Sequence, residues 1–548
     1  MKLIKYRRIL LALIILVAAF MRFYQLGQNP PSLTWDEAAW GYNAYSLGIS
    51  ARDEFGKFLP ISYLESFGDF KPPLYAYLAI IPVKIFGLSE FATRFPSAFF
   101  GVFTVFISYF LTKRIFWKSQ TAEIYALLTS FLLAISPWHI MLSRAAFEAN
   151  VATFLIASGV LMFLAGVQGK KWSLVAAAAL FALSFYTFNT ARVFSPLIVL
   201  VLVFAFRKKL LEMKSYVVIS FFAGLILLLP SISFLFSPQA GLRFREVNIF
   251  SDAMPVTISN RNIANSGGAI SSKILDNRRV FYGLSFVNHY FDNLSPYFLF
   301  ISGDGNPKFS IRSVGQMYIW ECLFFVAGIL FLFRKKEGNW WLVPVWILLG
   351  IIPAAVARET PHALRIETTL PMFQLITSYG IVNLLQAIRS RILGVNIGKV
   401  AIGLTMLFAV VNFVYFYHEL FKQYPYVYSG EWQYGYKESI NYAEGVKNDY
   451  DYIQVTNALG RPYIYYLFYT KASPSEFAKN AKVARDGFGF VKVSSFGKYK
   501  FPDGFDHSKE KGQKVLYINT PYNLPKGIKV LKNFKLLNGE TVLVAYTI

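Results

Sequence analysis

Long apolar runs alternate with short polar segments through about the first 420 residues of the chain. Crossing the hydrocarbon core of a membrane takes roughly 20 apolar residues per helix. The runs predict about eleven transmembrane helices. Their approximate positions are 9–24, 95–113, 121–137, 150–167, 173–189, 193–206, 216–236, 316–333, 340–356, 367–387 and 398–417. We therefore expect a polytopic α-helical membrane protein.

The pattern changes from about residue 419 to the end. Short β-type runs (DYIQVTNAL, KVLYINTP, IKVLKNF and ETVLVAYTI) alternate there with helix-period stretches such as YKESINYAEGVKN. This part predicts a small C-terminal soluble α/β domain, 419–548, after a transmembrane domain of 1–418. The apolar segment 72–87 is too short to span, and we expect it to form a helix along the outer leaflet.

The connecting segments alternate in charge. KLIKYRR, TKRIFWKS, QGKKW, RKKLLEMK, RKKEG and IRSRILGVNIGK are rich in bases, whereas HIMLSRAAFEAN, FNTAR and ARETPHALRIE hold His, Asn and carboxylates. By the positive-inside rule the first set is cytoplasmic. This predicts a multi-pass protein of the plasma membrane with a cytoplasmic N-terminus and an extracytoplasmic C-terminal domain. The main outer loops are then about 25–94, 138–149, 237–315 and 357–366.

Composition supports this class and excludes some chemistry. Of 548 residues 55% are hydrophobic, the mean hydropathy is +0.41 and the formal net charge is +24. A soluble domain would not carry so much apolar surface. Many Lys and Arg residues lie in the predicted cytoplasmic segments, where the positive-inside rule accounts for them. We therefore expect no nucleic-acid partner. The single cysteine, Cys322, excludes an internal disulfide and a Cys-based metal site.

Two adjacent carboxylates, Asp36 and Glu37, follow the first span in SLTWDEAAWGYNAY. Neighbouring residues on a helix point roughly 100° apart, so both cannot easily reach one reacting atom. We expect one to act while the other orients the loop. A glycoside hydrolase would need both carboxyl groups to flank a bond, roughly 5 Å or more apart. A transferase with a phosphate-activated sugar needs only one general base, because phosphate is already a good leaving group. Solvated loop charge is the alternative interpretation.

A departing phosphate also needs cations, and the predicted outer face contains them. Lys71, Arg192 and Arg365 could supply positive charge to it, and His362 lies in the same last loop as Arg365. Contacts with lipid headgroups are the alternative for these side chains. Further candidates for contacts with substrate are Trp35, Tyr42, Asp69, His139 and Arg144.

Several of these motifs, taken in order, resemble one group of membrane enzymes. WDEAAWGYNAY, GDFKPPLYAYL, SEFATRFPSAFFGV, ISPWHIMLSRAAFEAN, GNPKFSIRSVGQMYIWE and PHALRIETTLP resemble segments of the protein O-mannosyltransferase family, glycosyltransferase family 39, and of the bacterial aminoarabinose transferases. The resemblance covers roughly residues 1–415 and is specific as a set. It implies the GT-C glycosyltransferase architecture and a sugar donor carried on a polyprenyl phosphate.

The resemblance also implies roles for individual residues. Asp36 matches the first-loop carboxylate that acts as base on the acceptor, with Glu37 supporting it. Lys71 matches the lysine of the KPP motif that contacts the donor phosphate, and His362 and Arg365 fall in the last-loop segment. Glu148 stands where many relatives have an acidic residue, sometimes linked to a divalent cation. Because several relatives need no metal, the resemblance is compatible with an enzyme that uses a divalent cation and with one that does not.

The sequence therefore predicts a hexosyl- or pentosyltransferase that moves one sugar from a polyprenyl-phosphate carrier to a lipid, glycan or protein acceptor. Transfer would take place at the outer face of the cytoplasmic membrane, with inversion at the anomeric carbon. The rival hypothesis is a transporter or flippase for a lipid-linked saccharide. Transporters tend to place functional charges within their spans and to contain repeats. The predicted spans are nearly free of acids and no repeat is visible, which argues against this hypothesis.

Overall fold

The computed structural model describes residues 5–388, 391–392, 395–485, 490–510 and 512–548. It divides into two compact units. The helical unit comprises Met1–Arg22, Phe99–Ser143 and Glu148–Phe416, and the mixed unit comprises Phe23–Ala98, Arg144–Phe147 and Tyr417–Ile548. The predicted basic segment IRSRILGVNIGK lies in part outside the described residues.

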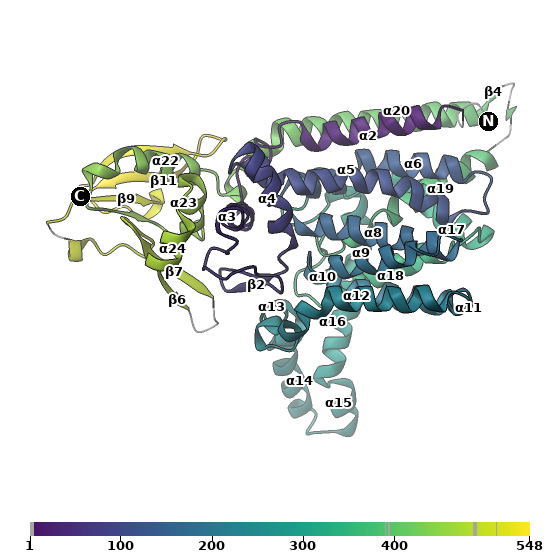
Figure 1. Ribbon diagram of the computed structural model, residues 1–548, viewed down its shortest axis with the longest axis horizontal. Helices are drawn as coiled ribbons and strands as arrows, with labels where there is room; N and C mark the ends of the chain where they lie inside the picture. Colours follow the sequence, from purple (N-terminus) through teal and green to yellow (C-terminus); the bar gives the residue numbers. More distant parts are fainter. Residues whose placement is uncertain (1–4, 389–390, 393–394, 486–489, 511) are drawn as a thin grey trace. The chain divides into compact units, whose positions relative to one another are not determined.

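Helices, most of them apolar, build the helical unit, and the longer ones lie roughly parallel to one another (Figure 1). They are α2 (Arg7–Phe23), α5 (Glu90–Ile115), α6 (Ala122–Ile135), α7 (Pro137–Arg144), α8 (Glu148–Val167), α9 (Ser173–Ser184), α10 (Asn189–Ala205), α11 (Arg207–Leu211), α12 (Lys214–Leu235), α17 (Glu321–Lys335), α18 (Leu342–Ala355), α19 (Met372–Ala387) and α20 (Ile397–His418). Each apolar segment predicted to span contains one of these helices. The apolar pattern therefore located the helices correctly.

Fewer of these helices meet the length and hydropathy expected of a complete span. Among the described residues four do so, namely Glu90–Ile115, Glu148–Val167, Lys214–Leu235 and Val400–Tyr428. A fifth is reached if α6 and α7, bent by 54° at their junction, count as one. Several others, including α9, α10 and α18, are shorter apolar helices. The count of about eleven spans therefore stays a prediction.

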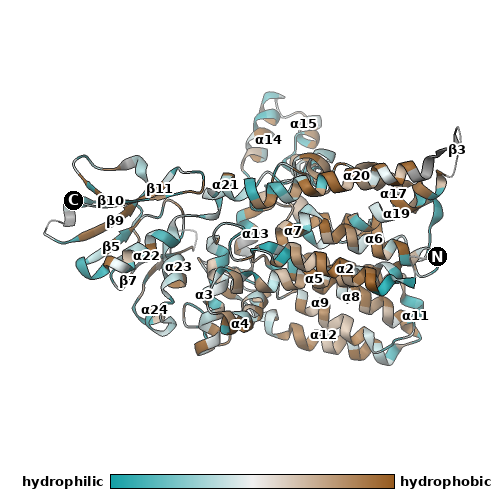
Figure 2. Cartoon of the chain, turned by 90° about the horizontal axis from the view of Figure 1, so that it is seen from above, coloured by the Kyte–Doolittle hydropathy of each residue, from teal (hydrophilic) through white to brown (hydrophobic). Residues whose placement is uncertain are grey.

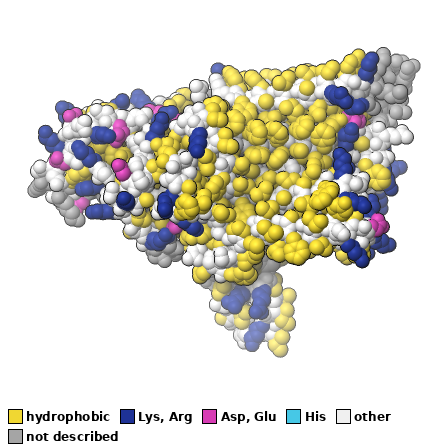
Figure 3. Space-filling model, viewed as in Figure 1, with side chains coloured by type: hydrophobic (Ala, Val, Ile, Leu, Met, Phe, Trp, Pro, Cys, Tyr) yellow, Lys and Arg dark blue, Asp and Glu magenta, His cyan; other side chains and the backbone are white. Residues whose placement is uncertain are grey.

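The surface of the helical unit separates apolar from charged side chains. Hydrophobic residues cover the long helices in Figure 2, and Figure 3 shows them as one broad apolar face. Lys and Arg side chains gather at the end of the helices where the N-terminus and α11 lie (Figure 3). Such a distribution is typical of helices that cross a membrane with basic loops on one side.

The predicted outer loop 237–315 is largely helical. It contains α13 (Leu242–Val247), α14 (Met254–Asn265), α15 (Ile270–Leu275), α16 (Arg278–Asp292) and a π-helical turn, η3 (Phe298–Ser302). Ile249 N donates to Val356 O at 2.9 Å, and Arg358 N donates to Val247 O at 2.9 Å. These two bonds join the segment to the start of the last predicted outer loop.

The mixed unit contains a seven-stranded sheet with the strand order β10-β11-β9-β5-β8-β7-β6. Its strands are β5 (Tyr452–Val455), β6 (Lys482–Arg485), β7 (Val491–Phe496), β8 (Tyr499–Lys500), β9 (Val515–Asn519), β10 (Lys529–Lys535) and β11 (Thr541–Thr547). β5 is parallel to β8 and β9, and the other neighbours are antiparallel. The four predicted β-type runs contain β5, β9, β10 and β11. β6, β7 and β8 were not predicted, because their short polar stretches lack a strong apolar alternation.

Helices and a hairpin complete the mixed unit. The C-terminal part contributes α22 (Tyr436–Val446), α23 (Pro462–Thr470) and α24 (Pro474–Asn480), and the segment after the first predicted span contributes α3 (Trp35–Ser50), α4 (Leu74–Phe86), β1 (Leu64–Ser66) and β2 (Asp69–Lys71). The helix α4 coincides with the short helix predicted at 72–87. β1 and β2 form an antiparallel pair in which Leu64 faces Lys71.

The first outer segment and the C-terminal sheet share one hydrophobic core. Residues of α3 pack against α23, and both contribute to the same buried cluster. The hydroxyl of Tyr42 donates to Ala472 O, and that of Tyr465 donates to Leu33 O, both at 3.0 Å. Val491 N donates to Phe67 O, also at 3.0 Å. The segment that carries the acidic pair is thus held by the C-terminal part of the chain.

Within the helical unit, close packing of α17 against α19 depends on glycine. A Cβ on Gly380 would lie 1.8 Å from Phe324 O, whereas one on Gly403 in α20 would meet nothing within 4 Å. We expect Gly380→Ala to reduce stability by about 1–3 kcal/mol, because the helices must separate. Thermal unfolding in detergent should show a lower midpoint for this variant. The control Gly403→Ala should match or slightly exceed the wild type; equal midpoints for both variants would contradict the packing.

Candidate active site

Asp36 and Lys71 form an ion pair in the mixed unit. Asp36 lies in the first turn of α3, and Lys71 ends β2. The Lys71 side chain is 10% exposed and the Asp36 side chain 50%. The ammonium lies 5.3 Å from the centre of the Trp40 ring and 5.4 Å from that of Phe67. A sheltered cation and an accessible carboxylate therefore stand side by side.

The sequence before α3 explains why the helix begins there. Thr34 has an extended backbone and its hydroxyl accepts the Glu37 N–H at 3.2 Å, while Glu37 Oε2 accepts the Thr34 N–H at 3.0 Å. This reciprocal capping box satisfies two backbone donors at the start of the helix. A carboxylate in a first helical turn is also stabilised by the helix dipole. The position of Asp36 thus follows from the cap.

Glu37 is engaged on both oxygens and only 1% exposed. Its Oε1 accepts Arg94 Nε at 2.8 Å and Ala146 N at 2.9 Å, and its Oε2 also accepts an Arg94 NH2 proton at 3.2 Å. Arg94 in turn donates to the carbonyls of Leu26, Pro30 and Ser32. Glu37 therefore has the geometry of an orienting residue, and Asp36 that of an accessible one.

The other sequence candidates in the mixed unit differ in accessibility. Tyr42 is fully buried in the core, and Trp35 packs at its edge against Gly460. Arg144 is buried, donates to Asn29 O at 2.7 Å and lies over the Phe421 ring. Asp69 is partly exposed at the start of β2, the strand that ends in Lys71.

In the helical unit, His139 belongs to a buried polar cluster. Arg22 NH2 donates to His139 Nδ1 at 2.6 Å, so Nε2 carries the proton and donates to Asn150 Oδ1 at 3.1 Å. Arg22 also donates to the carbonyls of Leu133 and Ala134. Both ring nitrogens are thus occupied within the protein.

Glu148 opens α8 and is coupled electrostatically to Glu367, a buried carboxyl in the 3-10 turn Glu367–Thr369. Two carboxylates match the way Mg²⁺ is held together with substrate phosphate, so the donor set is compatible with a hydrated divalent cation. No group of three or more His, Cys, Asp or Glu side chains that could hold a metal occurs in the described part of the chain. Glu148 and Glu367 alone would therefore not complete the coordination of a metal ion.

The predicted phosphate ligands of the helical unit occupy two places. Arg192 Nε donates to Phe185 O at 3.2 Å, and its NH1 donates to Asn189 Oδ1 at 3.0 Å. Arg365 donates to Glu359 O at 3.0 Å and lies 3.6 Å from the Glu359 carboxylate. Arg365 thus has a local acidic neighbour in the last outer loop.

His362 is buried beside Asp304, a residue that the sequence did not single out. His362 Nδ1 lies 3.9 Å from Asp304 Oδ2, and the centres of the His362 and Phe309 rings are 4.8 Å apart, with the rings tilted by 33°. Asp304 accepts Asn306 N at 2.8 Å and Ala363 N at 2.7 Å. Burial nevertheless raises the pKa of Asp304 to about 6. The GDGNP turn was the available sequence signal for this carboxyl.

Asp53 and Glu54, two adjacent acids that are buried in the structure, were also not singled out from the sequence. Both belong to the segment after α3, and Glu54 is fully buried. Burial raises the pKa of Asp53 and raises the pKa of Glu54 well above its ordinary range. The Glu54 N–H donates to Asn43 Oδ1 at 2.9 Å. In the sequence ARDEFGK looks like a polar turn, and nothing local shows that it is buried.

Comparison with known proteins agrees with the motifs. Residues 70–234 match the family model of dolichyl-phosphate-mannose-protein mannosyltransferases. The whole chain is similar to ArnT from Cupriavidus metallidurans bound to undecaprenyl phosphate, with a TM-score of 0.55, 12% identity and coverage of 97% of each chain. The chain has the GT-C fold. The family resemblance and the GT-C architecture expected from the sequence are thereby confirmed, while the count of about eleven spans stays a prediction.

Two further proteins are similar to parts of this GT-C chain. The oligosaccharyltransferase of Archaeoglobus fulgidus, tethered to an acceptor peptide with the NVT sequon, has a TM-score of 0.50 and 15% identity over 84% of this chain and 63% of that one. An uncharacterized protein of Aquifex aeolicus is 32% identical over 146 residues. That match spans 26% of this chain and 27% of the relative. The family match includes Lys71 and Glu148 but begins after Asp36.

The buried ion pair in this GT-C chain should be essential to its stability. Glu37→Gln leaves the Arg94 guanidinium buried without its counter-charge, which typically costs about 3–5 kcal/mol. We expect a clearly lower thermal midpoint in detergent. The control Asp503→Asn removes one partner of an exposed pair with Lys492 and should change stability by less than about 1 kcal/mol. A Glu37→Gln midpoint equal to that of the control would show that the pair is dispensable.

Asp304 should make stability depend on pH. Its folded pKa of about 6 exceeds the unfolded value of roughly 3.9, so the folded state keeps a proton that the unfolded state has lost. As pH rises from about 4 to 6, this group should therefore lower stability by up to about 3 kcal/mol, with no further change above that window. Thermal unfolding of Asp304→Asn at several pH values should lack this loss. The exposed Asp449→Asn should retain it; parallel pH profiles of wild type and Asp304→Asn would contradict the assignment.

Proposed function

We propose that the protein transfers a single glycosyl group from a polyprenyl-phosphate sugar to an acceptor at the outer face of the cytoplasmic membrane. Asp36 acts as the general base, and the sugar inverts at its anomeric carbon. The observation that carries the proposal is the pairing of the half-exposed Asp36 with the sheltered Lys71 on a helix start anchored by Glu37. The fold shared with ArnT adds support.

The reaction needs few groups. Asp36 accepts the proton of the acceptor hydroxyl or amine as that atom attacks the anomeric carbon from the side opposite the phosphate. The bond between the anomeric carbon and the phosphate oxygen breaks, and its electron pair stays on the phosphate. Lys71 stabilises the charge that develops there. Because phosphate leaves readily, a second carboxyl acting as a general acid is unnecessary, and Glu37 is free for its structural task.

Lys71 would contact both the general base, Asp36, and the departing phosphate. In the structure its ammonium pairs with Asp36. The donor is a phosphodiester with one negative charge, and a second charge develops on its phosphate as the bond to the sugar breaks. This phosphate would compete with the Asp36 carboxylate for the same ammonium. Binding of the donor would then release Asp36 for the acceptor, so that the base becomes available only when the leaving group is in place. Arg192, His362 and Arg365 remain candidates for further contacts with donor phosphate.

The comparisons support a lipid-linked donor by similarity. The C. metallidurans ArnT structure contains undecaprenyl phosphate, which is a polyprenyl phosphate. The family model that matches residues 70–234 describes enzymes whose donor is a dolichyl phosphate sugar. A long apolar tail would remain in lipid while the phosphate and the sugar stay at the interface.

One experiment tests the reaction class. Purified protein in detergent is incubated with a panel of polyprenyl-phosphate hexoses and pentoses, and release of the free carrier is followed by mass spectrometry. We expect carrier release from one donor class, accelerated by the correct acceptor. A transporter or flippase would release no carrier, and that outcome would contradict the proposal. A parallel arm with chelator tests dependence on a divalent cation.

Replacement of the base gives a sharper test. Asp36→Asn keeps the size of the side chain but cannot accept the proton, so we expect carrier release to fall by roughly 10²–10⁴-fold. Its thermal midpoint should fall less than that of Glu37→Gln, because Asp36 is half exposed and the asparagine Oδ1 can still accept a hydrogen bond from Lys71. The control Glu431→Gln changes an exposed acid of the same unit and should leave turnover unchanged. Turnover of Asp36→Asn at the wild-type rate would exclude this residue as the base.

A further inference from the structure

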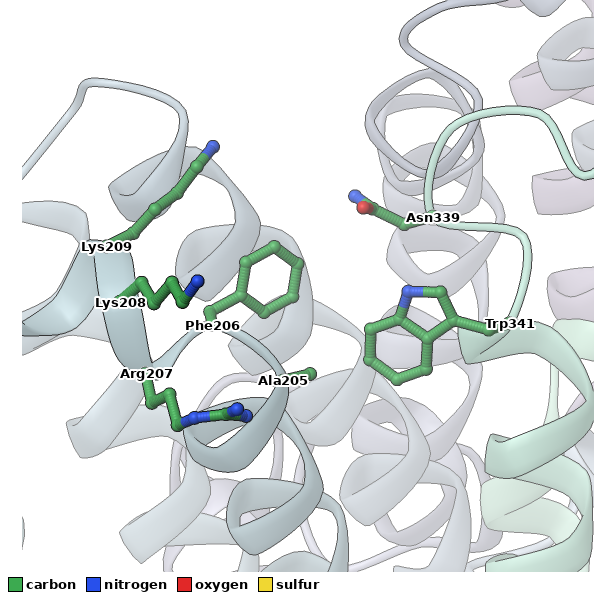
Figure 4. A pocket seen from close by; sticks show the side chains of 7 residues that line it. All are labelled: Ala205, Phe206, Arg207, Lys208, Lys209, Asn339 and Trp341. Atoms are coloured by element: carbon green, nitrogen blue, oxygen red, sulfur yellow. The ribbon is translucent and has the colours of Figure 1, made fainter.

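A basic pocket opens in the helical unit at the junction of α10 and α11. Its volume is about 450 Å³, and its lining consists of Ala205, Phe206, Arg207, Lys208, Lys209, Asn339 and Trp341. Figure 4 shows the three cationic side chains on one wall and Asn339 with Trp341 on the other. The lining contains three bases and no acid, so the pocket favours an anion.

The wall opposite the cations is held by backbone geometry. Gly338 has a φ of +60°, and a Cβ there would lie 2.3 Å from Ile115 O. The next residue, Asn339, donates its backbone N–H to the same carbonyl at 2.8 Å. This close turn fixes the start of the loop that leads to Trp341. The pocket is thus a defined structural feature and more than a group of surface lysines.

The cationic wall is ordered by contacts of its own. Arg207 NH1 donates to Phe204 O at 3.0 Å, and its guanidinium lies 4.6 Å from the centre of the Phe204 ring. Lys209 Nζ lies 3.5 Å from Val167 O. The rings of Phe206 and Trp341 are 6.1 Å apart and bridge the two walls. Aromatic and cationic side chains therefore line the same pocket.

The surface beside the pocket is apolar and exposed. Leu200, Val203 and Phe204 on α10 are 65%, 44% and 69% exposed, and Leu211 on α11 is 64% exposed. A free phosphate ion would use the cations only. A phospholipid would also place its acyl chains along these side chains, while its phosphate meets the bases. The combination favours a lipid over a soluble anion.

We propose that this pocket binds the phosphate group of an anionic phospholipid at the basic end of the helical unit. The basic segments predict this end to be cytoplasmic, which is the side opposite the proposed sugar transfer. The site is independent of the Asp36–Lys71 pair, and failure of either proposal leaves the other standing. Trp341 would lie near the lipid headgroups, where amphipathic rings such as indole are favoured.

The test compares two sets of substitutions of basic residues by glutamine in the full-length protein. Arg207→Gln, Lys208→Gln and Lys209→Gln are combined in one variant, and the control combines Lys170→Gln with Lys171→Gln. The control residues are exposed lysines of another predicted basic segment and do not line the pocket. Binding of short-chain phosphatidylglycerol to protein in neutral detergent is titrated by native mass spectrometry.

We expect the dissociation constant for phosphatidylglycerol to rise about tenfold in the triple variant and less than twofold in the control. Neutral phosphatidylcholine should bind more weakly than phosphatidylglycerol to the wild type and equally to all three proteins. Equal phosphatidylglycerol affinities for wild type and triple variant would overturn the proposal. Displacement of the lipid by glycerol phosphate at comparable concentration would also overturn it, because the pocket would then be a site for a soluble phosphate. Thermal unfolding of each variant shows that it remains folded.

Discussion

The ion pair between Glu37 and Arg94 is the interaction on which the rest of the candidate site depends. Both side chains are buried, and a buried ion pair is favourable only when further hydrogen bonds satisfy it. Here the carboxylate also accepts the N–H groups of Thr34 and Ala146, and the guanidinium binds three backbone carbonyls. One network therefore fixes the chain before α3, the start of α3 and a residue of the second predicted outer loop.

This network gives two adjacent acids different environments. The first turn of α3 directs Glu37 into the protein and leaves Asp36 at its edge, where it meets Lys71. The proposed role of Asp36 as a general base requires a carboxylate that is accessible, held in place and close to the charge that forms on the leaving group. The capping box and the contact of Glu37 with Arg94 fix the start of α3. Asp36 is half exposed there and lies beside Lys71. The position of Asp36 is thus a consequence of how Glu37 is bound.

Periodic features were predictable from the sequence, whereas long-range pairings were not. Apolar runs located the helices of the helical unit, and the angle between neighbouring helical residues anticipated different environments for Asp36 and Glu37. The partner of Glu37 is a distant arginine in SEFATRFPS, and no spacing rule connects the two. His139 was expected to be available to substrate, yet Arg22 and Asn150 occupy both of its ring nitrogens. The shared core of α3 and α23 likewise depends on contacts between the two ends of the chain.

A cryo-EM structure of the protein with bound polyprenyl phosphate would test the central claim most directly. The account predicts that the Lys71 ammonium lies within hydrogen-bond distance of a phosphate oxygen. It also predicts that Asp36 has separated from Lys71 and that the Glu37–Arg94 pair is unchanged. A bound phosphate that leaves Lys71 paired with Asp36 and makes no contact with the ammonium would contradict the account.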